Sequence, residues 1–462
     1  MSTTTTTTGP HILAYSYPAS SHIIPLLDLT RQLLTRGLTV TVLVTPNSLT
    51  LLQPLLSIHL SSLHPLVLPA AQPQPSWNSR IEKDRAIRDL HYPLLINWFH
   101  SHPSPPVAIV SDFFLGWTHH LAKELGIPRV VFSPSGAFAL SVLYSLWRDV
   151  PKIDDDINFP KIPHSPIFPW RQITAHYTNG KEGEPNWEFS RSCILDDIAS
   201  WGLIFNSFAE LERVYVDHLR TELGHDRVWA VGPLLPLEDD VAGFNNRGGS
   251  SSVPCDQVMT WLDARPDNSI VYVCFGSRTS LNTKQIEVLA SALEISGVQF
   301  ILCVRNGSDE GRVDVDRGEI PDGFEDRVEG KGFVIKGWAP QVAILKHRAV
   351  GAFLTHCGWN SVLEGVTAGK VMLTWPMGSD QYTNAKLLVD QLGVGIRVAE
   401  DTENIPESIE MARLLVESVS VTRPERVRVK ELSGAALGAI KGGSSDKDLD
   451  GFVKLLPREL NL

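Results

Sequence analysis

Short apolar runs alternate with helical patterns along the whole chain, and this alternation constrains the fold more than any other feature. In the first half, the predicted strands are residues 11–17, 39–45, 107–112, 129–134, 202–207 and 228–233. In the second half, they are residues 269–277, 299–305, 333–338, 350–356, 371–376 and 394–400. The runs are continuously apolar, as in strands buried on both faces of a parallel sheet. The pattern predicts an α/β fold with two doubly wound, Rossmann-like domains.

A polar segment separates the two halves. Residues 237–254 are rich in Gly, Ser, Asn and acidic residues and show no periodicity, so they are predicted to be a linker. The predicted domains are residues 1–236 and 255–445, and residues 446–462 are expected to form a helical tail that packs on the first domain. The Pro-rich residues 154–170 are expected to be an irregular loop. Two such halves predict a cleft between domains, and ligands of these sheets bind outside the carboxyl ends of the strands.

Composition excludes several classes of protein. The net charge of −11 argues against a nucleic-acid partner, which would require a basic face. The five cysteines are scattered without paired spacing, which indicates no disulfide framework and favours a reducing compartment. The polar start, MSTTTTTTGP, does not resemble a signal peptide, and no apolar run approaches the roughly 20 residues that span a bilayer. We therefore expect a cytoplasmic monomer without an integral membrane segment.

The stretch THCGWNSVLEG, residues 355–365, predicts an anion-binding corner. His356 ends a predicted strand and a helical pattern follows, so the N–H groups and the positive dipole end of that helix face the ligand edge. Asn360 and Ser361 add donors, and Glu364 lies one turn further on the same face, where its carboxylate suits a sugar diol. The alternative is that Asn360 and Ser361 only cap the helix. The spacing is wrong for a zinc site.

Two other strand ends carry polar or flat side chains. In VCFGSRTS, residues 273–280, Gly276 and Ser277 open a tight turn that lets the backbone approach a phosphate. In GWAPQ, residues 337–341, Trp338 is placed to stack on a flat base, although an ordinary core Trp would give the same pattern. These corners predict a nucleotide site in the second domain.

Residues 338–381 resemble the C-terminal signature of the plant secondary-product UDP-glycosyltransferases. Further stretches that resemble this family are FGS (275–277), NSFAELE (206–212), VGPL (231–234), LGIPR (125–129) and GGSS (442–445). The resemblance covers nearly the whole chain. It implies the GT-B fold, with an acceptor site in the N-terminal half, a UDP-sugar site in the C-terminal half and a cleft between them.

The resemblance also implies a donor site, residue by residue. Trp338 would stack on uracil, with Ala339 and Gln341 beside the base or ribose, and Glu364 would hold the ribose hydroxyls. The residues implied to hold the diphosphate are Ser277, His356, Asn360 and Ser361. Those implied to hold the sugar hydroxyls are Trp359, Asp380 and Gln381.

A histidine and an aspartate are expected to form the catalytic pair. His22 lies where a helix begins after the first strand, and a helix N-terminus disfavours imidazolium, so His22 is expected to accept a proton. Asp112 ends a strand at the same sheet edge and could fix the histidine tautomer. The resemblance implies that His22 deprotonates the acceptor in an inverting displacement that needs no metal. The acidic clusters at Asp154–Asp156 and at Asp314 and Asp316 are interpreted as solvated charge.

The acceptor and the sugar are less constrained. The candidate acceptor-binding residues are aromatic, namely Phe113, Phe114, Trp117, Phe138 and Trp147, and suggest a flat phenolic such as a flavonol. O-transfer is the expected reaction, and C-transfer stays open. The glutamine that ends the signature, Gln381, is similar to the residue found there in family members that use UDP-glucose. Lys370-Val371 and Gly378-Ser379 depart from the family pattern, are expected near the sugar, and leave UDP-rhamnose or UDP-xylose open. A sugar-nucleotide epimerase and a non-catalytic UDP-sugar sensor are the more remote alternatives.

Overall fold

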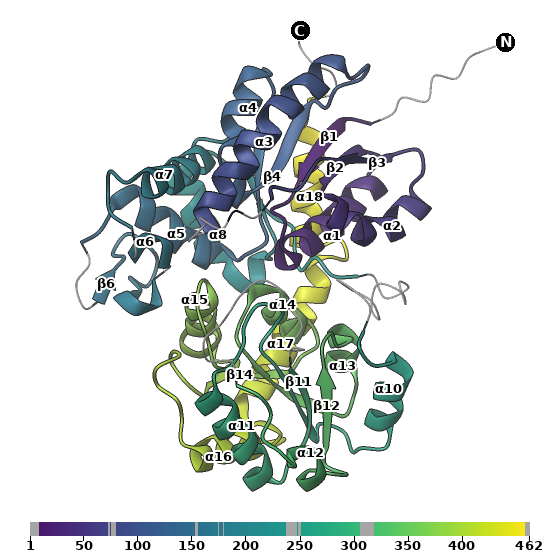
Figure 1. Ribbon diagram of the computed structural model, residues 1–462, viewed down its shortest axis with the longest axis vertical. Helices are drawn as coiled ribbons and strands as arrows, with labels where there is room; N and C mark the ends of the chain where they lie inside the picture. Colours follow the sequence, from purple (N-terminus) through teal and green to yellow (C-terminus); the bar gives the residue numbers. More distant parts are fainter. Residues whose placement is uncertain are drawn as a thin grey trace, which may run out of the picture. The chain divides into compact units, whose positions relative to one another are not determined.

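The computed structural model describes residues 9–72, 74, 80–152, 156–173, 175–178, 180–236, 247, 251–304 and 318–457. The chain divides into two compact units (Figure 1). The first contains the residues up to Leu234 and those from Ala439 onward, and the second contains Leu235–Gly438. Asp154, Asp155, Asp314 and Asp316 lie outside the described residues. In the described part of the chain, no helix is both long and apolar enough to cross a bilayer.

The first unit is built on one parallel sheet. Its strands are β1 (His11–Tyr15), β2 (Thr39–Val44), β3 (Leu63–Val67), β4 (Ala108–Asp112), β5 (Arg129–Ser133), β8 (Gly202–Phe205) and β9 (Val228–Ala230). The strand order is β3-β2-β1-β4-β5-β8-β9, and every neighbouring pair is parallel. The order reverses between β1 and β4, which is the switch point where ligands of such sheets bind.

Helices cover this sheet on both faces. They are α1 (Ser20–Thr35), α2 (Leu49–Ile58), α3 (Arg80–Ser101), α4 (Thr118–Glu124), α5 (Ala137–Asp149), α6 (Ala175–Thr178), α7 (Pro185–Ile198), α8 (Ala209–Leu223) and α18 (Ser444–Leu455). Alternate residues of β1 belong to two different core clusters: Ile12 and Ala14 to one, Leu13 and Tyr15 to the other. Because successive strand side chains point to opposite faces, both faces of the sheet are buried, which is why the strands are continuously apolar.

The second unit repeats the architecture. Its strands are β10 (Ile270–Cys274), β11 (Gln299–Val304), β12 (Gly332–Lys336), β13 (Val350–Thr355), β14 (Val371–Thr374) and β15 (Gly395–Arg397). All neighbours are parallel in the order β12-β11-β10-β13-β14-β15, so the switch point lies between β10 and β13. Its helices are α10 (Cys255–Asp263), α11 (Thr283–Ser296), α12 (Phe324–Arg327), α13 (Gln341–Lys346), α14 (Trp359–Thr367), α15 (Gln381–Lys386), α16 (Ser408–Ser418) and α17 (Pro424–Ala439). Asn282 and Gln285 form a capping box at the start of α11.

The last helix, α18, packs on strand β9 of the first unit, where the contacting residues Ala230 and Asp448 lie 218 positions apart in sequence. Asp448 accepts a hydrogen bond from the backbone N–H of Ala230 at 2.9 Å, and Phe452 packs against Trp229 with ring centroids 5.2 Å apart. Arg36, which directly follows α1, forms ion pairs with Asp446 and Asp450. The C-terminal helix thus closes the edge of the first unit with apolar and charged contacts.

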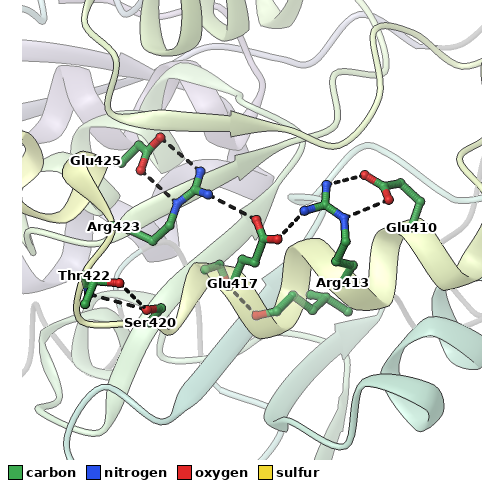
Figure 2. A network of polar contacts seen from close by, with 9 residues as sticks. Glu410, Arg413, Glu417, Ser420, Thr422, Arg423 and Glu425 are labelled. Carbon is green, nitrogen blue, oxygen red and sulfur yellow. Dashed lines mark hydrogen bonds and ion pairs between the residues drawn. The ribbon is translucent and has the colours of Figure 1, made fainter.

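A network of ion pairs joins α16 to the start of α17 (Figure 2). Arg413 pairs with Glu410 and with Glu417 on the exposed side of α16. Arg423 links Glu417, at 3.1 Å, to Glu425, at 3.0 Å. Exposed pairs of this kind contribute little individually because water and salt screen them, so the network fixes the turn between the helices more than it stabilises the unit.

The structure contains every strand predicted from the sequence and adds three. Strand β3 is an edge strand that contains Pro65, and proline suppresses the strand signal although an edge position tolerates it. Residues 154–170 were expected to be irregular, but β6 (Asp156–Asn158) and β7 (Ile167–Pro169) form a short antiparallel pair there. Three-residue strands carry too little periodicity to be predicted.

Candidate active site

His22 and Asp112 meet at the switch point of the first sheet. His22 lies in the first turn of α1, which follows β1, and Asp112 is the last residue of the adjacent strand β4. His22 Nδ1 lies 2.7 Å from Asp112 Oδ2, and both side chains are buried. A carboxylate can only accept, so neutral His22 donates from Nδ1 and keeps Nε2 as its proton-accepting nitrogen. The predicted pair therefore has the geometry of a general base with its orienting carboxylate.

The surrounding chain holds this pair in place. The backbone N–H of Phe114 donates to Asp112 Oδ1 at 2.9 Å, and Arg129 donates to the Asp112 carbonyl at 3.3 Å. The rings of Phe113 and Phe114 lie beside the imidazole, with centroids 5.8 and 4.8 Å away. Of the predicted acceptor residues, these two lie beside His22 and Asp112.

The other three predicted acceptor residues lie in packed regions. Trp117 contacts Tyr15 edge-on and is 3% exposed. Phe138 stacks on Tyr215 with centroids 4.4 Å apart, and Trp147 packs against Tyr177 and Trp187. Their burial gives each of them a packing role in this structure, and their contact with an acceptor stays a prediction.

Sequence reasoning missed a second carboxylate near the catalytic pair. Asp84 of α3 is 4% exposed, and burial raises its pKa, against the opposing effects of Arg80 and a hydrogen bond from Tyr17. The Arg80 guanidinium lies 3.8 Å from the centroid of the Phe114 ring, and the Tyr17 ring contacts the imidazole of His22. Because the sequence of α3 shows little apolar periodicity, only the packing of α3 against residues 113–115, which follow β4, reveals this group.

In the second unit, His356 directly follows β13 at the predicted anion corner. A Cβ atom added to Gly276 or Gly358 would lie 2.5 or 2.4 Å from His356 Nε2, so both glycines are needed for the ring to fit. Burial lowers the pKa of His356 to about 4, so the ring is neutral at pH 7 and donates one N–H. Within the described residues, His356 Nδ1 is buried without a hydrogen-bond partner, and no side chain caps the N-terminus of α14. These groups can donate to an anion.

The polar face of α14 forms a connected group. Gln341 Nε2 donates to Glu364 at 2.7 Å and to Ser361 at 3.2 Å, while Tyr272 donates to Gln341 Oε1 at 3.1 Å. Glu364 also forms an ion pair with Arg247, and both of these side chains are nearly buried. The structure therefore brings together three residues of the predicted donor site, Gln341, Ser361 and Glu364. Tyr272 and Arg247 also belong to this hydrogen-bonded group, although the sequence did not indicate them.

Trp338 is held by residues of the predicted linker. Its backbone N–H donates to Ser252 Oγ at 2.8 Å, and its carbonyl accepts from the backbone N–H of Ser252 at 2.7 Å. The indole N–H donates to the carbonyl of Arg247 at 3.2 Å. Ala339 follows and is 8% exposed, with its carbonyl accepting from the N–H of Gln341. Residues of the linker therefore hold Trp338, the residue predicted to stack on the uracil base, in a fixed position.

The predicted sugar residues lie around the starts of α14 and α15. Gln381 Oε1 accepts from the N–H groups of Met377, at 2.8 Å, and Gly378, at 3.1 Å. Asn384, which sequence reasoning missed, donates to Asp380 at 3.1 Å and to the carbonyl of Cys357 at 2.9 Å. Trp359 is the first residue of α14. Asn384 therefore joins the Asp380 carboxylate to the corner that holds His356. Ser277, at the turn after β10, is exposed.

The prediction that Lys370 lies near the sugar end is wrong. Lys370 directly precedes β14, and its Nζ donates to the carbonyls of Val350 at 2.8 Å and His347 at 3.2 Å. These are groups at the amino ends of the strands, whereas Asp380 and Gln381 follow the carboxyl end of β14. The length of strand β14 separates Lys370 from Asp380, so the two residues lie at opposite edges of the sheet.

Burial lowers the pKa of Lys370 to about 8, which predicts a pH-dependent stability. Between pH 8 and the ordinary lysine range, the unfolded state binds more protons than the folded state, so stability rises with pH. Relative to Lys370→Met, the wild-type protein should gain about 2 kcal/mol of unfolding free energy between pH 7 and pH 9.5. Urea unfolding at both pH values measures this, with exposed Lys331→Met as the control. The prediction would be contradicted if the pH-dependent gain of the wild-type protein relative to Lys370→Met were no larger than its gain relative to Lys331→Met.

Comparisons with known proteins identify a family match and full-length relatives. Residues 225–405 match the family described as UDP-glucoronosyl and UDP-glucosyl transferase. A flavonol 3-O-glucosyltransferase of Arabidopsis thaliana is 52% identical over 97% of this chain and 96% of its own. A flavonol 7-O-rhamnosyltransferase of the same species is 40% identical over 98% of this chain and 99% of its own. The similarity therefore extends over both units.

Solved structures show the same architecture. The crystal structure of an Arabidopsis thaliana glycosyltransferase complexed with UDP-L-rhamnose matches with a TM-score of 0.80 and 37% identity, over 97% of this chain and 99% of that one. The same protein has been solved in complex with quercetin. With two doubly wound sheets, this likeness confirms the predicted GT-B fold. The chain belongs to the UDP-glycosyltransferase family and is an enzyme of that class.

Proposed function

We propose that this enzyme transfers glucose from UDP-glucose to a hydroxyl group of a flavonol, with inversion at the anomeric carbon. The observation that carries the mechanism is the 2.7 Å hydrogen bond between His22 and Asp112 at the switch point of the first sheet. The relatives that support the acceptor class are the flavonol glucosyltransferase and the protein solved with quercetin. Glucose is favoured over rhamnose because the glucosyltransferase is the more similar of the two relatives compared above.

In the proposed reaction, His22 Nε2 removes the proton from the acceptor hydroxyl as its oxygen attacks the anomeric carbon. The Nδ1–H stays directed at Asp112, whose carboxylate stabilises the imidazolium that forms. The bond between the anomeric carbon and the UDP oxygen breaks, and UDP leaves with both electrons of that bond. The histidine returns its proton to solvent after the product leaves.

The donor is proposed to bind along the polar corners of the second unit. Uracil stacks on Trp338 beside Ala339 and Gln341, and the ribose hydroxyls bind Glu364. The groups proposed to hold the diphosphate are the N-terminus of α14, Ser277, His356, Asn360 and Ser361. A neutral His356 suits this role because it donates without carrying a charge that would retain the product. The sugar hydroxyls bind Trp359, Asp380 and Gln381.

The test is transfer itself. The pure enzyme is incubated with quercetin and, in separate reactions, with UDP-glucose, UDP-rhamnose or UDP-xylose, and the products are measured by mass spectrometry. We expect addition of a hexose with UDP-glucose at the highest kcat/KM. Preferential addition of a deoxyhexose would instead show that the donor is UDP-rhamnose, as the name of the rhamnosyltransferase relative suggests. UDP-sugar binding without transfer to any phenolic acceptor would contradict the proposal and favour a sensor. Acid hydrolysis of the product would separate O-glycosides, which are cleaved, from C-glycosides, which resist.

We propose that the reaction uses no metal ion. Among the described residues, no group of three or more His, Cys, Asp or Glu side chains is arranged to hold one. The diphosphate charge is offset instead by N–H groups and the dipole of α14. We expect kcat with UDP-glucose to change by less than about twofold when EDTA is added, because these donors are part of the chain. Loss of activity with EDTA that Mg²⁺ or Mn²⁺ restores would contradict this.

The cellular location is also a proposal. None of the five cysteines forms a disulfide in the described structure, which supports a reducing compartment such as the cytoplasm. Fractionation of tissue that expresses the protein, followed by immunoblotting, would test it, and recovery in a membrane or secreted fraction would contradict it.

A further inference from the structure

Two of the free cysteines face each other across adjacent strands of the second sheet. Cys274 is the last residue of β10, and it is the register partner of Cys303 on the parallel strand β11. Register partners point their side chains to the same face, and adjacent strands lie about 4.7–4.9 Å apart, within the Cα separation of about 4.4–6.8 Å that a disulfide bridges. The two thiols therefore form a cross-strand dithiol.

The dithiol lies beside the residues assigned to the donor. Cys274 directly precedes Phe275, Gly276 and Ser277, the turn at the diphosphate corner. Cys303 Sγ donates to the carbonyl of Gly337 at 3.3 Å, and Gly337 directly precedes Trp338. A change in the bonding of Cys303 would therefore act on the loop that carries the proposed uracil-stacking residue.

Cys303 differs from the buried Cys193 and Cys357 in access, and Cys274 differs from them in acidity. Cys303 is partly exposed and lines a small, partly open pocket of about 50 Å³ together with Gly276, Thr279 and Ser280. Burial raises the pKa of Cys193 to about 12 and that of Cys357 further, which makes these thiols inert. Hydrogen bonding between the two thiols lowers the pKa of Cys274 and raises that of Cys303, so the thiolate is favoured on Cys274.

We propose that Cys274 and Cys303 are a modification site, at which a hydroperoxide forms a reversible cross-strand disulfide that weakens binding of the UDP-sugar. The effect on binding rests on the proposed function, because it assumes that the donor occupies the corners of Gly276, Trp338 and His356. The disulfide removes the thiol hydrogen of Cys303 that the carbonyl of Gly337 accepts. Exchange with a small dithiol can reverse it.

The oxidation balances with hydrogen peroxide as the oxidant. A thiolate of the pair attacks one peroxide oxygen, the O–O bond breaks, and hydroxide leaves, which gives a sulfenic acid. The second thiol then attacks the sulfenic sulfur, the S–O bond breaks, and water leaves. Two S–H bonds are lost, one S–S bond forms, and the peroxide is reduced to two molecules of water. A dithiol such as dithiothreitol reverses the reaction by exchange.

The experiment uses the full-length chain, reduced and then treated with hydrogen peroxide. Peptide mapping after alkylation of the remaining thiols should show a disulfide between Cys274 and Cys303. Calorimetry with UDP should show that the dissociation constant rises about five- to tenfold, as expected for the loss of one hydrogen bond, and that dithiothreitol restores it. Cys274→Ser and Cys303→Ser should each bind UDP after peroxide treatment as tightly as before it. The control, Cys255→Ser, should respond like the wild-type protein.

The outcomes separate this proposal from the proposed function. Absence of the Cys274–Cys303 peptide in oxidised wild-type protein would overturn the modification site, whatever the effect on UDP. A rise in the dissociation constant that persists in Cys303→Ser would place the oxidative effect elsewhere and also overturn it. If reduced wild-type protein fails to bind UDP, the donor assignment fails, while peptide mapping still decides whether the disulfide forms.

Discussion

Replacing His22 with alanine should lower kcat by about 10²–10⁴, the contribution of a positioned general base. The dissociation constant of UDP should change less than twofold, because the proposed UDP-binding residues all belong to the second unit and His22 belongs to the first. Steady-state kinetics with quercetin and UDP-glucose measure the first quantity, and calorimetry with UDP measures the second. Unchanged turnover would mean that the base is another group.

Asp112→Asn is the matched test of the orienting role. The amide can donate to His22 Nδ1, which would move the ring proton to Nε2 and remove the proton-accepting nitrogen from the acceptor side. A fall in kcat comparable to that of His22→Ala is expected, with little change in folding because the side chains have the same shape. His120→Ala, at a more exposed histidine of the same unit, should retain full activity. Full activity in Asp112→Asn would contradict the assigned pair.

Replacing Glu364 with alanine should raise the KM for UDP-glucose by about 10–100-fold and change kcat little. Two hydrogen bonds from ribose hydroxyls to a carboxylate account for a loss of this size. The ribose assignment has its own readout: wild-type protein should bind UDP more tightly than 2′,3′-dideoxy-UDP, and the variant should bind both equally. Calorimetry with the two nucleotides measures this difference.

The control for Glu364 is Glu325→Ala, which removes an exposed carboxylate of the same unit that pairs with Lys336. It should leave both affinities unchanged. Arg247→Ala adds a second comparison, since Arg247 forms an ion pair with Glu364 and the ribose must share or replace this contact. A Glu364→Ala variant that still prefers UDP over the dideoxy nucleotide would show that the ribose binds elsewhere.

Local sequence determined the strands and the corners. The apolar runs around residues 11–17 and 350–356 are continuous because both sheet faces are buried, so one-dimensional patterning was enough to locate β1 and β13. The turn after β13 was also readable, because Gly358, Asn360 and Ser361 are residue types that a strand–helix corner requires. The position of His356 against Gly276 and Gly358 then explains why those two sites are glycine.

Only the tertiary structure decided which groups meet. His22 and Asp112 lie 90 positions apart, and Arg247 and Glu364 lie 117 apart, so their contacts depend on the order in which strands join the sheet. The same strand order makes Cys274 and Cys303 register partners, and it brings Lys370 to the carbonyl of Val350. Periodicity reports whether a residue is buried and on which face, because burial is a local property of each element. It does not report which elements are neighbours, because pairing is set by the packing of the whole chain.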